Sequence, residues 1–206
     1  MTKRTATSRS RVGKRVDAIT LLKQDHREVA ALFTRFERAG DAATRTKQRL
    51  VEEMIEALAR HAGIEELVFY SAVRREVAGT DSEVLEALEE HHVVKILLHE
   101  LEALAPVDER FDAKVTVMIE SVRHHVKEEE QELFPKVRKR LGRSRLLDIG
   151  DELRGAKQRV PTRPHPFSPD EPPANAIVGG AVAVLDRART AGKKVVDRVR
   201  DEVPSA

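Results

Sequence analysis

The chain has 206 residues, which is enough for one hydrophobic core, and its lack of cysteine excludes disulfides and thiolate-held metal sites. Its formal net charge is only +2, so overall charge gives no argument for a nucleic-acid partner. No apolar run reaches the roughly 18 residues of a membrane span, and the start lacks the apolar segment of a secretory signal. We therefore expect a soluble cytoplasmic protein with no integral membrane segment.

The first segment, residues 1–16, is rich in Thr, Ser, Lys and Arg and has few apolar positions. Such a segment buries too little surface to offset the entropy of ordering, so we predict a flexible basic tail. An organellar transit peptide has a similar composition, but a solvated tail is the interpretation that we favour.

From residue 17 to residue 140, apolar residues recur at threes and fours, which predicts four helices. Each expected break pairs a helix terminator with an N-capping residue, and the terminators are Gly40, Gly79, Pro106 and Gly142. Short connections make neighbouring helices antiparallel. The sequence thus predicts an all-α fold over 17–158, an up-and-down four-helix bundle with a short extra helix at residues 144–158.

The C-terminal part has a different character, with six prolines that predict an extended linker over 159–174. The tail over 175–206 spaces apolar residues at threes and fours among basic ones, which indicates an amphipathic helix weakened by glycines. Docking on the bundle, docking on a second subunit or another protein partner, and disorder are the main interpretations. Contact with a membrane surface is a lesser one.

The most informative motif is a His-x-x-x-Glu pair that occurs twice, as His61/Glu65 and His125/Glu129. Four residues advance a helix by about 400°, so each pair projects from one stripe of one helix. The surroundings repeat as well: Met-Ile-Glu precedes each pair, Glu-Glu closes it and Val-Arg follows at one offset. This register selects His125 over His124, which we place on the surface.

Two single histidines match each other in the same way, because Asp25-His26-x-x-Val-x-x-Leu parallels Glu90-His91-x-x-Val-x-x-Leu. The match favours His91 over His92, which points about 100° away on a helix. The chain midpoints between these histidines and the pairs fall at about residues 44, 77 and 109, close to the predicted turns. All six donors are therefore expected in one layer of the bundle.

Burying so many polar groups without a cation is costly, which predicts a metal centre. Imidazole and carboxylate donors without sulfur suit iron, manganese or zinc, and six exceed one tetrahedral zinc. Two metal ions are implied, with Glu65 and Glu129 as bridges. An oxo or hydroxo bridge and ligands such as oxygen, peroxide or nitric oxide fill the remaining positions.

With these residues the chain resembles the hemerythrin-like, or HHE cation-binding, family over about residues 17–140, most specifically in His125-Val-Lys-Glu-Glu-Glu-Gln-Glu-Leu-Phe-Pro135. The resemblance implies a four-helix bundle around a non-haem di-iron centre that binds oxygen or related small molecules. It also implies iron ligation by His26, His61, Glu65, His91, His125 and Glu129.

One position departs from the oxygen-carrying members, which place a second histidine four residues after the first on the third helix. Here that position is Lys95, and His99 lies about 12 Å along the axis from His91, too far to replace it. One imidazole fewer leaves a more open iron. This favours peroxide or redox chemistry, including catalase-like protection against oxidative stress, over reversible oxygen carriage.

Helical counting also assigns the neighbours of the site. We expect Glu66 and Glu130, about 140° from their histidines, at the rim or surface. Phe69 and Leu133 are expected to wall the pocket. Tyr70 is expected to point away, without a redox role.

Two other classes of function stay open at this stage. One is a non-catalytic iron or oxygen sensor, or an iron-binding module, that acts through its C-terminal tail. The other is a metal-free helical interaction module, in which the histidines contribute little to thermal stability.

Overall fold

The protein is described by a computed structural model that covers residues 15–172 and 174–202. Within these ranges the chain forms helices and no strand. The predicted flexible tail therefore lies outside the described residues except for its last two positions, 15 and 16.

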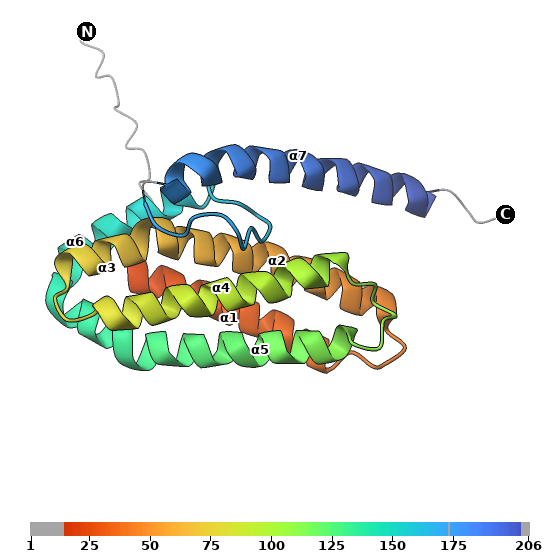
Figure 1. The fold of residues 1–206 in the computed structure, drawn as a ribbon, viewed down its shortest axis with the longest axis horizontal. Helices are drawn as coiled ribbons and strands as arrows, with labels where there is room; N and C mark the ends of the chain where they lie inside the picture. The colour runs from red at the N-terminus through yellow and green to blue at the C-terminus, as the bar shows by residue number, and fades with distance from the viewer. Residues whose placement is uncertain (1–14, 173, 203–206) are drawn as a thin grey trace, which may run out of the picture.

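The predicted up-and-down bundle is present, as Figure 1 shows, with four antiparallel helical rods around one core. The rods are α1 (Ala18–Glu37), α2 with η1 and α3 (Thr44–Ile64, Glu65–Phe69, Tyr70–Glu76), α4 (Asp81–Ala103), and α5 with η2 and the start of α6 (Phe111–Glu128, Glu129–Leu133, Phe134–Ala156). The loops between them agree with the turns expected near Gly40, Gly79 and Pro106. At the first helix, the Asp17 side chain accepts a hydrogen bond from the Thr20 N–H and caps it.

Two rods contain a feature that the sequence did not predict, a single π-helical turn. The turn η1 begins at Glu65 and η2 begins at Glu129. In each, the backbone N–H five residues on bonds to the glutamate carbonyl, so one extra residue is inserted into the helix. Every residue after the turn is rotated relative to α-helical counting.

The apolar core is divided into two layers, with the predicted site histidines between them. On α1, Leu22 belongs to one layer and Val29 to the other, and His26 lies between. On α4, Leu88 and Val94 flank the site in the same way. The apolar spacing at threes and fours thus places one polar layer inside an otherwise hydrophobic bundle.

The helix α6 bends at Gly142, where φ is +67°. This left-handed conformation favours glycine, and it separates the fourth rod from the short extra helix predicted for residues 144–158. The segment after the bend packs on α1, and Gly150 approaches the chain so closely that a Cβ there would lie 2.2 Å from the Val16 carbonyl oxygen. Glycine at both positions is therefore required by the backbone.

The last helix, α7 (Ala174–Glu202), runs over the outside of the bundle (Figure 1). Its buried Asp186 accepts hydrogen bonds from the backbone N–H groups of Thr162 and Arg163 and contacts His165, which holds the helix against the proline-rich linker. The apolar and basic side chains predicted at 193–200 and at Val203 lie outside the described part. None of the described helices is long and apolar enough to cross a membrane.

Candidate metal centre

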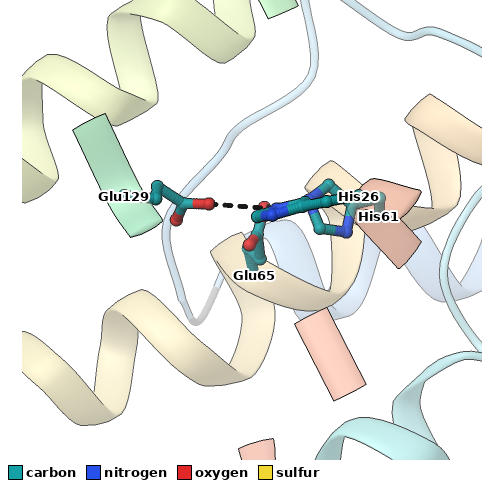
Figure 2. A group of neighbouring side chains, drawn as sticks. All are labelled: His26, His61, Glu65 and Glu129. Atoms are coloured by element: carbon teal, nitrogen blue, oxygen red, sulfur yellow. Dashed lines mark hydrogen bonds and ion pairs between the residues drawn. The ribbon is translucent and has the colours of Figure 1, made fainter. Parts of the chain in front are cut away.

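The structure brings the six predicted donor residues together in the middle of the bundle, and Figure 2 shows four of them converging. All six side chains are buried. They come from all four rods: His26 from α1, His61 and Glu65 from α2 and η1, His91 from α4, and His125 and Glu129 from α5 and η2. No single rod could build this cluster alone.

The four histidines form two pairs. The Nε2 atoms of His26 and His61 lie 3.1 Å apart, and those of His91 and His125 lie 3.2 Å apart. In both pairs the imidazoles point the same ring nitrogen toward the centre.

The two carboxylates lie between these pairs. The Oε2 atom of Glu65 lies 3.1 Å from Nε2 of His61 and 3.4 Å from Nε2 of His91. The Oε2 atom of Glu129 lies 3.3 Å and 3.6 Å from the Nε2 atoms of the other two histidines. Each glutamate is therefore placed to contact two cations, one at each histidine pair.

The outward-facing nitrogen of every site histidine meets a carboxylate from a neighbouring rod. The contacts with the Nδ1 atoms are Asp25 to His61 at 3.6 Å, Glu66 to His91 at 2.9 Å, Glu90 to His125 at 2.8 Å and Glu130 to His26 at 2.9 Å. An acid on each rod thus contacts the histidine of the next rod, and the acid on the fourth rod contacts the histidine of the first. The contacts form a closed ring, and partners of this kind fix the tautomer and orientation of metal-binding imidazoles.

The positions of these acids in the sequence explain why the ring closes. On α1 and α4 the acid comes one residue before the histidine, whereas on the other two rods it comes one residue after the glutamate donor. One residue is about 100° of rotation, and antiparallel rods turn in opposite senses when viewed from one end. A step back on one rod and a step forward on its neighbour therefore point the same way around the bundle.

The expectation that Glu66 and Glu130 lie at the rim or surface was wrong for Glu66 but agrees with Glu130, whose side chain is 30% exposed. Glu66 is buried and also pairs with Lys95 at 2.7 Å, while the partly buried Glu130 pairs with Lys23 at 2.9 Å. The prediction considered one helix at a time, so it treated every residue that does not face the metal as exposed to solvent. In a bundle, such residues face the two neighbouring rods.

The buried donors fit a metal ion better than they fit one another. Nδ1 of His26, His91 and His125 each lies within hydrogen-bonding distance of an acid, which favours the ring proton there and an inward-facing Nε2 lone pair, whereas Nδ1 of His61 only approaches Asp25 and makes no hydrogen bond. Neither oxygen of Glu65 accepts a hydrogen bond, nor does Oε2 of Glu129. Lone pairs of nitrogen and oxygen thus meet at about 3 Å in a buried site, an arrangement that cations between them would stabilise.

The electrostatics of the site reflect this crowding. Burial, followed by repulsion from Glu129, raises the pKa of Glu65 well above its usual value. Burial also opposes ionisation of Glu129, but the neighbouring His125 and His26 outweigh it and lower the pKa of Glu129 to about 2. Burial lowers the pKa of His61 and, more strongly, that of His91. Neutral imidazoles, the form that binds metal, are favoured at both positions.

Tyr70 points into the site, contrary to the expectation that it points away. Its hydroxyl donates a hydrogen bond of 2.9 Å to Oε1 of Glu129 and lies 3.5 Å from Nε2 of His91. The π-turn explains the error: Tyr70 is nine residues after His61, about 180° around an α-helix, but the inserted residue reduces this to about 80°. Burial raises the pKa of Tyr70 well above its usual value, so the phenol stays protonated.

The repeat places Phe134 where the first half has Tyr70, and its ring stacks on His26 with centroids 5.8 Å apart. The two halves of the centre therefore differ by one hydroxyl, and Glu65 has no partner equivalent to Tyr70. Phe69 and Leu133, expected to wall the pocket, lie in the adjoining apolar layer.

The remaining histidines lie away from the centre. His124 is exposed, as expected, and so is His99, while His92 is partly exposed. Lys95 does not replace the missing imidazole, because its ammonium group binds Glu66.

The ring makes a quantitative prediction for Glu66. Replacing it (Glu66→Ala) should lower the affinity for a divalent cation about 10- to 100-fold, because His91 loses the partner that orients its ring. Calorimetric titration of the metal-free chain would measure this. Glu89→Ala removes an exposed glutamate and should change nothing, and equal affinities for the two variants would contradict the role of the ring.

Comparison with known proteins agrees with this geometry. The family model of the hemerythrin HHE cation binding domain matches residues 17–137. An uncharacterized hemerythrin-like protein of Schizosaccharomyces pombe is 28% identical over 167 residues, which cover 81% of each chain. A DNA nickase of Nostoc sp. is 28% identical over 143 residues, but these span 69% of this chain and only 40% of the nickase.

Among solved structures, the fold is similar to a hemerythrin HHE cation binding domain-containing protein from Mycobacterium kansasii. The TM-score is 0.59 at 20% sequence identity, with 69% of this chain and 85% of that one covered. A family model that matches well over half of the chain, and that coincides with the bundle and its cluster of donors, establishes the relationship. The chain belongs to the hemerythrin HHE cation-binding domain family.

Proposed function

We propose that the chain is a non-haem di-iron protein that binds oxygen or a related small molecule, such as peroxide or nitric oxide, in the cytoplasm. One iron would be held by His26 and His61 and the other by His91 and His125, with Glu65 and Glu129 shared. The observation that carries this proposal is the position of the two glutamates between the histidine pairs, with carboxylate oxygens that accept no hydrogen bond.

The space beside the centre supports a small ligand. A cavity of about 30 Å³ lies against the four histidines and is otherwise lined mainly by aliphatic side chains. This is about the volume of one water molecule in the liquid, so it suits a ligand of two or three atoms. The valines and leucines around it exclude bulk water, which strengthens electrostatic interactions within the pocket.

Iron held in this way supplies open coordination positions and electron transfer to such ligands. The chain's own residues set the surroundings: the ring of acids holds the imidazoles, and the Tyr70 hydroxyl holds Glu129. Lys95 also lines the cavity and brings a positive charge to it, the one lysine or arginine among the residues of that lining. With Lys95 in place of an imidazole, peroxide decomposition in protection against oxidative stress is the activity that we favour.

Metal analysis of the purified chain, followed by a peroxide assay, tests this proposal. We expect two iron ions per chain, absorption between about 300 and 400 nm from ligands bound to ferric iron, and release of oxygen from hydrogen peroxide. If the iron-loaded chain does not decompose peroxide, the proposed enzymatic activity is refuted and only the proposed binding of a small ligand is kept. A chain that retains no iron, even after anaerobic loading, would refute the whole proposal.

A further inference from the structure

A second cavity, of about 60 Å³, lies between α4 and α5, two rods that pack side by side (Figure 1). Apart from Ala87, Leu133 and one histidine, its lining consists of glutamates, and it includes no lysine or arginine. These are Glu83, Glu86, Glu90, Glu128, Glu129 and Glu132. The volume is enough for a small cation with a few water molecules.

This cavity reaches two of the six donors of the metal centre. His125 and Glu129 both line it, and both are donors of the buried cluster. Glu129 is only 2% exposed, and its Oε2 atom accepts no hydrogen bond in the described structure. A buried glutamate that keeps one oxygen without a hydrogen-bond donor therefore lines the same cavity as five other glutamates.

Two glutamates of the lining, Glu90 and Glu128, also belong to a second group of donors, whose third member, His124, is not part of the lining. Ligand atoms of Glu90, His124 and Glu128 lie within 4.8 Å of one another, and the His124 side chain is 63% exposed. Glu90 connects this group to the centre, because its other oxygen binds Nδ1 of His125 at 2.8 Å. Donors thus follow one another from solvent to Glu129.

The cavity for the small ligand differs from this one in charge. Its lining includes Lys95, which is paired with Glu66, whereas the cavity between α4 and α5 is lined by six glutamates, of which Glu83 is paired with Lys136. Since the net charge of the chain is only +2, the field at each opening is set by these local groups. Clefts lined by one sign of charge raise the local concentration of the opposite ion and speed its binding.

We propose that divalent cations reach the centre through this cavity, which we call the glutamate channel. Cations bind first at Glu90, His124 and Glu128 and then pass to Glu129. This inference rests on the proposed metal centre, but it concerns the path by which the centre is filled. It assigns a role to glutamates that neither hold a site histidine nor contact the metal.

The rate of cobalt uptake tests the channel separately from the centre. The full chain, stripped of metal by a chelator, is mixed with Co²⁺ in a stopped-flow instrument, and the visible bands of bound cobalt are followed. We expect the double variant Glu86→Gln/Glu132→Gln to take up Co²⁺ about ten-fold more slowly than the wild type at low salt. The final amount bound should be unchanged, and the difference should shrink as salt screens the charges.

The matched control is Glu89→Gln/Glu120→Gln, which removes the same charge from exposed positions outside the channel. It should take up cobalt at the wild-type rate. Equal rates for the channel and control variants, with full binding in both, would overturn the channel and leave the metal centre intact. If the wild-type chain bound no Co²⁺ at all, the centre and the channel would both be refuted.

Discussion

Replacing His61 and His125 together by alanine is expected to abolish the thermal stabilisation that metal gives to this protein. A cation that binds only the folded state at about a thousand times its dissociation constant adds about 4 kcal/mol to the free energy of unfolding. For a chain of this size that corresponds to a melting temperature about 10 °C higher. Each histidine pair loses one member in this variant, so neither cation should bind tightly.

Calorimetric melting with and without a chelator provides the measurement. The wild type should lose its added stability when the metal is removed, whereas the double variant should melt at the same temperature in both conditions. His99→Ala, which removes an exposed histidine of α4, should behave as the wild type does. A wild-type chain that is indifferent to the chelator would instead support a metal-free helical module.

Replacing Glu65 by glutamine should have opposite effects on the metal-free and metal-loaded protein. Without metal, Glu65 is a buried group whose two oxygens accept no hydrogen bond, because Phe134 stands where a second tyrosine would have supplied a donor. Removing such a group is expected to raise the free energy of unfolding at neutral pH by about 1–3 kcal/mol. In the metal-loaded protein, the substitution removes the carboxylate that the two cations would share. The affinity for metal should therefore fall by more than about 100-fold, which is the upper range for residues that only orient a ligand.

The gain in free energy of unfolding that Glu65→Gln gives to the metal-free protein should depend on pH in a defined direction. The pKa of Glu65 is raised in the folded chain above its unfolded value of 4.5. The contribution of Glu65 to the free energy of unfolding of the wild type is therefore fully present below pH 4.5, and it is lost as the pH rises through the folded pKa. Glu65→Gln does not titrate. Its advantage should therefore be small near pH 4.5 and should grow toward pH 8.

Urea unfolding of the metal-free proteins at several pH values would measure this difference. Glu129 titrates in both proteins, so to a first approximation its contribution cancels in the comparison. Glu120→Gln, an exposed position on α5, serves as the control and should show no such trend. A glutamine variant that is less stable than the wild type at pH 8 without metal would show that Glu65 is not the costly buried carboxyl group that we infer.

The six central donors could be predicted from one sequence because the two halves of the chain repeat. The repeat selected His125 over His124 and His91 over His92, and the distances to the turns placed all six at one height. Helix geometry was sufficient here, since none of these residues follows a π-turn in its own rod. The structure places those same side chains together.

What the sequence could not give was the consequence of the π-turns and of the neighbouring rods. Tyr70 follows η1 directly, so counting at 100° per residue rotated it to the wrong side. Glu66 was misplaced because a single helix does not show what its neighbours cover. A signal was present nevertheless, since an acid lies next to one site residue on every rod, in matching positions of the two halves. The contact of Asp186 with residues 162 and 163 depends on the path of the linker, which no periodicity specifies.

The ring of acids also bears on the handedness of the fold. Four rods connected by short loops can follow one another clockwise or anticlockwise, and the apolar spacing is compatible with both. In the mirror arrangement, however, Asp25 would face the last rod instead of the second, and each of the other three acids would likewise face its other neighbouring rod. Every histidine would then receive its acid from the rod on its other side, so the pairs observed here, such as Asp25 with His61 and Glu90 with His125, record in which sense this chain is wound.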